Sequence, residues 1–283
     1  MSEIIMNHSV IAAAPASGKQ TSNIVDPLRG RHAVVTGASR GIGAAIAAAL
    51  ARHGANVTLM SRSQAVLADR AAELKRMYGI DAQAIAIDVA DEQRVAAAFA
   101  AASDRLGAPS ILVNNAGIAE AAPLSKTSFA MWQRVIGVDL TGAFLCCRQV
   151  LRDMVKAGQG RIVNVASTAG LTGYPYVAAY CAAKHGVIGL TRALAREVAR
   201  SNVTVNAVCP GYTDTDIVSD AVANIVAKTG RPREQALADL VAHNPQGRLI
   251  TPEEVADAVA WLCLPSSASI TGQSILVAGG ELM

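Results

Sequence analysis

The sequence predicts a single doubly wound α/β domain built on one parallel sheet. Three observations support this fold class. From Arg31 onward, short β-branched runs alternate with longer alanine-rich helical stretches, with turn residues between them. Hydrophobic residues make up 52% of the chain and aromatic residues only 4%, a composition typical of a buried parallel sheet under closely packed helices. In addition, no internal linker divides the 283 residues into two domains.

Each strand is expected where a β-branched run precedes a turn. The expected strands are 32–35, 56–60, 82–87, 111–114, 161–165, 203–208 and 274–277. The expected helices are 43–53, 64–78, 92–106, 128–155, 177–200 and 252–264. Because ligands of such sheets bind beyond the carboxyl ends of the strands, each loop that follows a strand is a candidate site.

Two segments depart from the alternation. Residues 214–247 offer two helices with no strand between them, and this pattern makes them a candidate substrate lid. Residues 1–29 are rich in Ala, Ser and Asn and are expected to form a mobile N-terminal arm. The dinucleotide-binding and catalytic domain is therefore assigned to residues 30–283.

Charge and composition exclude several classes of partner. The 25 basic and 22 acidic residues are spread along the chain, so no basic surface for nucleic acid or for a membrane is expected. No run reaches the roughly 18 apolar residues of a membrane span. The five cysteines show no metal-ligand spacing and the histidines are scattered, which predicts reduced thiols, a cytoplasmic location and no metal site. Small-molecule chemistry is favoured.

A glycine-rich turn, Thr-Gly-Ala-Ser-Arg-Gly-Ile-Gly at 36–43, joins the first strand to the first helix. Glycines allow a sharp turn and close approach to a phosphate, and a helix N-terminus offers free N–H groups and a positive dipole end. The turn is predicted to hold a dinucleotide pyrophosphate through Gly37, Ser39, Arg40, Gly41, Ile42 and Gly43. The alternative is a tight strand-to-helix turn without a ligand.

The end of the second strand indicates which dinucleotide is bound. An acidic residue there binds the ribose 2′-hydroxyl of NAD(H), whereas a basic residue accommodates the 2′-phosphate of NADP(H). Here Ser61 and Arg62 stand at this place, and Arg40 projects from the glycine loop. Two guanidinium groups can clamp a phosphate, so NADP(H) is predicted in preference to NAD(H). The alternative is a pair of solvated surface arginines.

A serine, a tyrosine and a lysine have the spacing of a proton-transfer site. Tyr180 and Lys184 are four residues apart in a helical pattern and therefore share one face. A nearby ammonium group is expected to lower the pKa of Tyr180 from its usual value of about 10. Ser167 ends a strand at the same sheet edge, where its hydroxyl can polarise a substrate oxygen. A Tyr-x-x-x-Lys pair alone is frequent on amphipathic helices, but the added serine makes chance a poor explanation.

With these motifs, the chain from about residue 31 to 280 resembles the short-chain dehydrogenase/reductase family, whose glycine motif has this longer spacing. The resemblance implies a Rossmann-like sheet of about seven strands in the order 3-2-1-4-5-6-7 and a homotetramer assembled through the long central helices. It also implies that Tyr180 is the general acid in carbonyl reduction. Ser167 would then polarise the carbonyl, and Lys184 would hold the nicotinamide ribose.

Further segments resemble the cofactor-contacting loops of the family. The resemblance places a carboxylate beside the adenine, a signature loop behind the cofactor, and hydroxyl partners near the nicotinamide carboxamide. The residues concerned are Asp88, Val89, Asn115, Ala116, Gly117, Pro210, Gly211, Thr213 and Thr215.

One position departs from the family pattern. Where many members carry a catalytic Asn, this chain has Asp139, which can accept hydrogen bonds but cannot donate them when ionised. Asp139 is therefore a candidate fourth catalytic residue with an altered proton relay. The departure also leaves open a cofactor-binding regulatory protein without turnover.

The overall pattern most resembles the 3-oxoacyl-(acyl-carrier-protein) and acyl-CoA reductases of the family. The predicted substrate is therefore a 3-oxoacyl thioester. Its rival is another ketone or secondary alcohol, because pocket walls carry no readable code.

Overall fold

The structure, a computed structural model, describes residues 26–282 and contains one seven-stranded parallel sheet. Its strand order, β3-β2-β1-β4-β5-β6-β7, confirms the predicted fold class and topology. The strands are β1 (His32–Thr36), β2 (Asn56–Ser61), β3 (Ala82–Ala86), β4 (Ile111–Asn114), β5 (Gly160–Val165), β6 (Val203–Pro210) and β7 (Ser274–Val277). Most of the predicted N-terminal arm lies outside the described residues.

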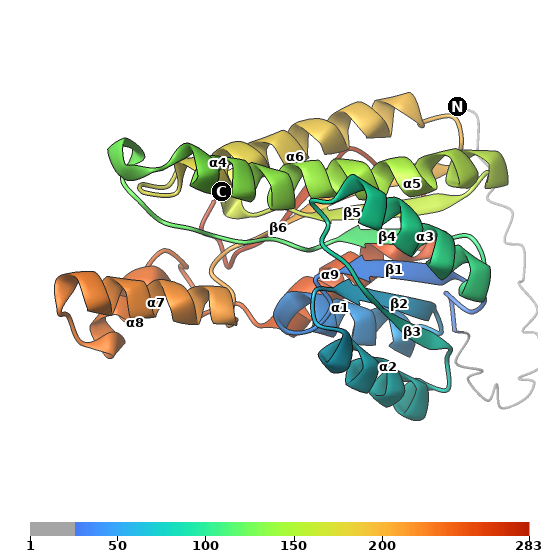
Figure 1. Ribbon diagram of the computed structural model, residues 1–283, viewed down its shortest axis with the longest axis horizontal. Coiled ribbons are helices and arrows are strands. Elements are labelled where there is room, and N and C mark those ends of the chain that lie inside the picture. The colour runs from blue at the N-terminus through green and yellow to red at the C-terminus, as the bar shows by residue number, and fades with distance from the viewer. Residues whose placement is uncertain (1–25, 283) are drawn as a thin grey trace, which may run out of the picture.

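Helices cover both faces of the sheet (Figure 1). One face carries α1 (Gly41–Arg52), α2 (Gln64–Tyr78) and α9 (Pro252–Cys263). The other face carries α3 (Glu92–Leu106), α5 (Gly142–Ala157) and α6 (Ala178–Glu197). Because both faces are covered, the central strands are apolar throughout most of their length, and β1 and β6 are buried at every position.

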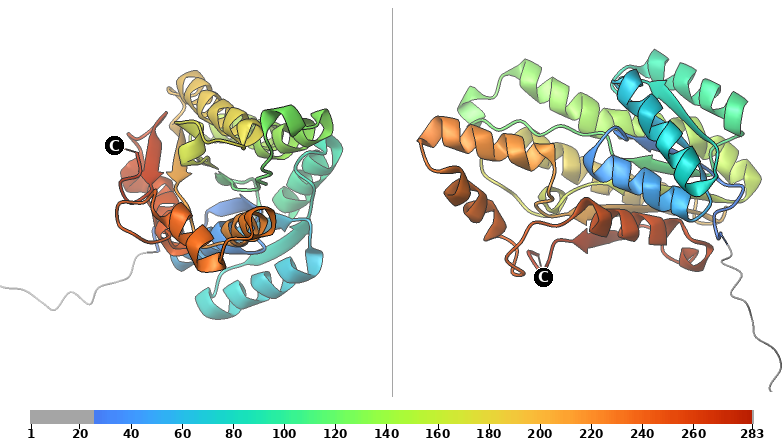
Figure 2. Two further views of the ribbon diagram at one scale, coloured as in Figure 1. Left: turned by 90° about the vertical axis from the view of Figure 1, so that its left-hand side faces the viewer. Right: turned by 90° about the horizontal axis from the view of Figure 1, so that it is seen from below.

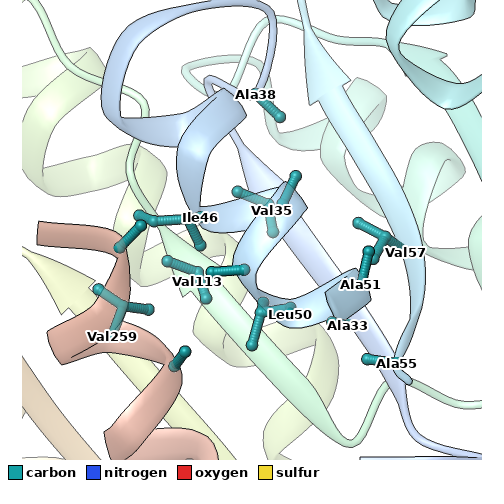
Figure 3. Close-up of a cluster of buried hydrophobic side chains, with 14 of the residues drawn as sticks. Ala33, Val35, Ala38, Ile46, Leu50, Ala51, Ala55, Val57, Val113 and Val259 are labelled. Atoms are coloured by element: carbon teal, nitrogen blue, oxygen red, sulfur yellow. The ribbon is translucent and has the colours of Figure 1, made fainter. Parts of the chain in front are cut away.

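The core beneath α1 and α9 shows how the first strand is held. Val35 of β1, Ile46 and Leu50 of α1 and Val259 of α9 point toward one another, and all four side chains are fully buried (Figure 3). Small alanine side chains let α1 approach both the sheet and α9 closely. This packing fixes the start of α1, where the glycine loop ends.

The long helix predicted over 128–155 is present but contains an irregular turn. The structure has α4 (Phe129–Ile136), a π-helical turn (Gly137–Thr141) and then α5. A π-turn inserts one extra residue per turn and often marks a functional position. The predicted helix is therefore confirmed, but its π-turn was not predicted; Asp139 lies in this turn and is 2% exposed.

Two helices follow β6 and extend beyond the carboxyl end of the sheet (Figures 1 and 2). They are α7 (Asp216–Thr229) and α8 (Arg233–Val241), which pack on each other through Val218, Val222 and Ala236. Both lie within the predicted lid segment, and no strand separates them. Their role as a lid stays a prediction.

Candidate active site

The glycine loop is shaped by close backbone contacts. Gly37 and Gly41 adopt φ values of +66° and +54°, a left-handed region that favours glycine. A Cβ on Gly43 would lie 2.3 Å from the Gly37 carbonyl oxygen and 2.4 Å from Asn115 Nδ2, so only glycine fits there. Arg40, before α1, makes no side-chain cap. The first turn of α1 therefore keeps N–H groups available for an anion.

The loop after β4 holds this glycine loop in place. Asn115 Nδ2 donates hydrogen bonds to the carbonyl oxygens of Thr36 and Gly37, at 3.0 and 3.3 Å. Thr36 Oγ1 in turn accepts from the backbone N–H groups of Asn115 and Ala116, at 3.0 and 3.1 Å. The glycine loop and the loop after β4, which were predicted separately, are thus joined through Asn115. We call these two joined loops the cradle.

The two arginines predicted for the 2′-phosphate lie at the surface. Arg40 Nη1 forms an ion pair with Asp216 Oδ2 at 2.6 Å, with both side chains more than half exposed. Arg62 is exposed, and Ser61 Oγ accepts a hydrogen bond from the Ser63 N–H at 3.3 Å. The pairing of Arg40 with the start of α7 was not predicted from the sequence.

The segment after β6 lies against the glycine loop. Thr213 Oγ1 donates to the Gly211 carbonyl oxygen at 3.0 Å, and Thr215 Oγ1 donates to the Thr213 carbonyl oxygen at 3.2 Å. A Cβ on Gly41 would lie 3.2 Å from Thr215 Cγ2. Both hydroxyl groups are in local turns, and Pro210 is buried at the strand end. The segment after β6 therefore lies beside the glycine loop, at one edge of the cradle.

The loop after β3 is held by its own turn. Asp88 Oδ1 accepts from the Ala90 N–H at 3.0 Å. Val89 is buried, and a Cβ on Gly142 would lie 2.8 Å from Val89 Cγ2. Asp88 is half-buried, so its carboxylate stays open to a ligand.

The predicted catalytic side chains come together at the end of β5. Ser167 follows this strand, and Tyr180 and Lys184 lie one turn apart on α6. Lys184 Nζ donates to the Val165 carbonyl oxygen at 3.1 Å and lies 5.4 Å from the centroid of the Tyr180 ring. A hydrogen bond with the Ser167 side chain lowers the pKa of Tyr180. The three residues whose spacing predicted a shared site, Ser167, Tyr180 and Lys184, therefore form one cluster.

Asp139 joins this cluster from the π-turn. Its Oδ2 lies 3.5 Å from Lys184 Nζ, and its Oδ1 accepts from the Ile118 N–H at 2.9 Å. Gly117 leaves room for both charged groups, because a Cβ there would lie 3.1 Å from Asp139 Oδ2 and 3.5 Å from Lys184 Nζ. Asp139 and Lys184 thus form a buried ion pair, with side chains 0% and 5% exposed.

The net pKa direction of Tyr180 differs from the prediction. Burial raises the pKa of the Tyr180 hydroxyl, Lys184 lowers it as expected, and the carboxylate of Asp139 raises it again. The lowering by Lys184 that was predicted is present, but it is outweighed, and the net pKa is raised. Burial is the main reason, and the carboxylate paired with Lys184 offsets part of the ammonium charge.

The contacts within an aromatic and acidic cluster beside the site were not predicted from the sequence. The Tyr174 hydroxyl donates to Glu281 and contacts Thr168 Oγ1 at 3.0 Å. The Tyr174 ring also meets the rings of Tyr212 and His243, with centroids 6.3 and 6.2 Å away. The cluster joins segments up to 107 residues apart, and no local spacing signals such contacts.

Residues 26–282 offer neither a membrane span nor a metal cluster. No helix in this range is both long and apolar enough to cross a membrane. Within the same range, His, Cys, Asp and Glu side chains form no group of three that could hold a metal ion.

Comparison with known proteins gives a consistent result. A family model described as short chain dehydrogenase matches residues 31–225. A cis-4-hydroxycyclohexanecarboxylate dehydrogenase from Sinomonas cyclohexanicum is 43% identical over 251 residues, which cover 88% of this chain and 96% of the relative. The 3-oxoacyl-[acyl-carrier-protein] reductase FabG of Vibrio cholerae is 41% identical over 257 residues, covering 90% and 99%.

A solved structure is similar in fold. The crystal structure of an actinorhodin polyketide ketoreductase variant with NADPH matches with a TM-score of 0.85 and 38% sequence identity. The match covers 89% of this chain and 97% of that chain. The similarity therefore extends over almost all of the described residues.

Proposed function

The chain belongs to the short-chain dehydrogenase family, and we propose that it transfers hydride between NADP(H) and a carbonyl or secondary alcohol, with a 3-oxoacyl thioester as the substrate. The observation that carries this proposal is the cluster of Ser167, Tyr180 and Lys184 at the carboxyl end of the sheet, beside the glycine loop. Ligands of doubly wound sheets bind at this edge.

The residues of the cradle fit a dinucleotide. The glycine loop and the free N–H groups of α1 would hold the pyrophosphate, and Arg40 and Arg62 would hold the 2′-phosphate. Asp88 would accept from the adenine, and Thr213 and Thr215 would contact the carboxamide. NADPH, the nucleotide in the crystal structure of the similar ketoreductase, supplies the hydride when bound.

Tyr180 is suited to donate a proton during reduction. Burial and Asp139 raise its pKa, so the hydroxyl stays protonated at neutral pH and can pass its proton to a carbonyl oxygen as the hydride arrives. Ser167 would stabilise the charge that develops on this oxygen. Lys184, fixed by Val165, would hold the nicotinamide ribose and keep the tyrosine in place.

The names of the relatives indicate two kinds of substrate. FabG and the polyketide ketoreductases are named for reduction of a 3-oxoacyl or ketoacyl group, whereas the Sinomonas enzyme is named for a cyclic hydroxy acid. The thioester proposal is supported by the number of ketoacyl relatives, and the cyclic alcohol is the specific alternative. A cofactor-binding protein without turnover is disfavoured by the complete Ser, Tyr and Lys set.

The first prediction tests both substrate and proton donor. We expect the protein to oxidise NADPH with a 3-oxoacyl thioester, and to do so more efficiently than with 4-oxocyclohexanecarboxylate, as followed by NADPH absorbance. The Tyr180→Phe variant should lose about 10²–10⁴-fold in kcat, because it removes the proton donor.

The matched control is Tyr78→Phe at the end of α2, remote from the site, which should keep full activity. Undiminished turnover in Tyr180→Phe would remove this residue from the mechanism. Faster turnover of the cyclic ketone would replace the thioester by the alternative substrate.

A further inference from the structure

The Asp139 carboxylate is buried and only partly satisfied by hydrogen bonds. Its Oδ1 accepts from the Ile118 N–H, but its Oδ2 has no hydrogen-bond partner within residues 26–282 and faces Lys184 Nζ at 3.5 Å. A carboxylate in such a place needs a cation, because an isolated buried charge is strongly unfavourable. Lys184 meets this need, and the two groups depend on each other.

The surroundings of this pair come from several elements. The titratable groups that face it or its tyrosine neighbour are Tyr180 and Cys181 on α6, Cys209 on β6 and Tyr212 after β6. Of these, Cys209 and Tyr212 are neutral at neutral pH, since burial raises the pKa of Cys209 to about 11 and raises that of Tyr212. The charge near Tyr180 is therefore set by Lys184 and Asp139.

The two charges of the pair act on Tyr180 in opposite directions. The Lys184 ammonium lies 5.4 Å from the ring centroid and favours the phenolate, whereas Asp139 favours the protonated phenol. Burial raises the pKa of Asp139 as well, but the Lys184 ammonium at 3.5 Å and the Ile118 N–H at 2.9 Å both favour the ionised carboxylate. The ion pair thus places a negative charge beside the ammonium that faces Tyr180.

We propose that Asp139 is a positioning residue which offsets the charge of Lys184 and so keeps Tyr180 protonated to higher pH. This inference rests on the proposed function of Tyr180 as proton donor. An uncharged residue at this position would leave the ammonium unopposed, and the phenolate would form at lower pH. The carboxylate therefore sets the pH above which alcohol oxidation, which needs the phenolate as proton acceptor, becomes fast.

The test uses the full-length protein without added nucleotide. The ionisation of Tyr180 is measured as the tyrosinate absorbance that is lost in Tyr180→Phe, in the wild type and in two neutral variants, Asp139→Asn and Asp139→Ser. We expect the Tyr180 midpoint to fall by about one pH unit in both variants. Asp257→Asn, which removes an exposed carboxylate paired with Arg52, is the control and should leave the midpoint unchanged.

A second measurement follows turnover. The pH at which alcohol oxidation reaches half of its maximal kcat should fall by the same amount in Asp139→Asn. The absorbance titration reads Tyr180 even if no substrate is turned over, so failure of the proposed function and failure of this inference give different results.

Two outcomes overturn the inference. One is an unchanged or higher Tyr180 midpoint in the folded neutral variants. The other outcome concerns the wild-type protein alone. A Tyr180 midpoint below about 9 would mean that Asp139 does not offset the charge of the Lys184 ammonium.

Discussion

At the scale of single residues, Arg40 has two possible anionic partners. In the structure it pairs with Asp216 at the start of α7, and the proposed function gives it the 2′-phosphate of NADP(H). An exposed ion pair contributes little, about 0–1 kcal/mol, whereas a bidentate phosphate contact is stronger. The phosphate should therefore displace Asp216 from Arg40.

This competition leads to a prediction on cofactor choice. The double variant Arg40→Ala, Arg62→Ala should bind NADPH about 10–100-fold more weakly, because it loses charge-assisted hydrogen bonds of about 1.5–3 kcal/mol. NADH affinity should change little, since that nucleotide lacks the phosphate. Titration of each nucleotide by protein fluorescence measures both constants.

The control for this prediction is Asp216→Asn, which removes the competing carboxylate and should leave NADPH binding equal or tighter. If the arginine variant lost equal affinity for NADPH and NADH, these side chains would not bind the 2′-phosphate.

The sequence predicts which residues form the proposed catalytic cluster, but it does not predict the pKa directions of those residues. Ser167, Tyr180 and Lys184 follow from spacing alone, since a strand end and one helical turn place them together. The pKa direction of Tyr180 depends on burial and on Asp139, and neither is visible in the spacing. The contact of Tyr174 with Glu281 was equally hidden, because it joins the loop between β5 and α6 to the C-terminal segment.

At the scale of elements, the π-turn is the feature that sequence periodicity could not show. One extra residue in a turn leaves the apolar pattern of 128–155 compatible with a regular helix. Gly142, the residue after this turn, packs against Val89 in a space that leaves no room for a Cβ. The turn directs Asp139 to Lys184, so the irregular element and the departure from the family pattern coincide at the site.

The two sides of α6 have different roles. Ala183 is fully buried, and a Cβ on Gly186 would lie 2.7 Å from Leu140 Cδ2, so these small residues face the protein's own core. Ala182 and Gly189 are seven residues apart and exposed, and nothing lies within 4 Å of a Cβ on Gly189. Near α6, α5 exposes Phe144 at 43%. This outer face suits close contact with a second copy of the chain.

We therefore predict a homotetramer that uses the outer face of α6. Gly189→Arg should reduce the mass measured by light scattering after gel filtration from four chains to two or one, because its long charged side chain prevents close helix approach. Gly189→Ala is the matched control: it fits the free surface and should stabilise the helix by about 0.5–1 kcal/mol. A tetrameric Gly189→Arg protein would place the interface elsewhere.

At the scale of the whole molecule, the sheet order and the strands were predicted nearly to the residue. Strands buried on both faces are continuous apolar runs, and the helices between them carry clear caps or glycine ends, such as Asp91 before α3 and Gly79 after α2. The largest shift at a strand end is in β6, which runs to Pro210 instead of 208 because β7 pairs with its last residues. Such pairing is a tertiary property.

A buried polar network ties this sheet to α3. The ring of His32 in β1 contacts the Gly107 carbonyl oxygen through Nδ1 at 2.6 Å and Thr58 Oγ1 through Nε2 at 2.7 Å. Gln83 Nε2 donates to the same Thr58 oxygen at 2.8 Å. All these contacts are satisfied if Nδ1 carries the proton and the Thr58 hydroxyl donates to Nε2. A second ring proton would leave that hydroxyl without its acceptor.

The network makes global stability sensitive to acid. Burial lowers the pKa of His32 in the folded state below its unfolded value of about 6.5, so the unfolded chain binds the proton more readily. The contribution of neutral His32 to the free energy of unfolding is complete above about pH 6.5 and is lost as the pH falls from there through the lower pKa of the folded state. We predict that the free energy of unfolding, measured in urea, drops by about 1–2 kcal/mol between about pH 7.5 and pH 5 through this group.

His32→Leu should be less stable at neutral pH but show a shallower pH dependence, whereas His53→Asn should retain the wild-type slope. If His32→Leu kept the full slope, other groups would control the acid response, and the His32 network would contribute to packing alone.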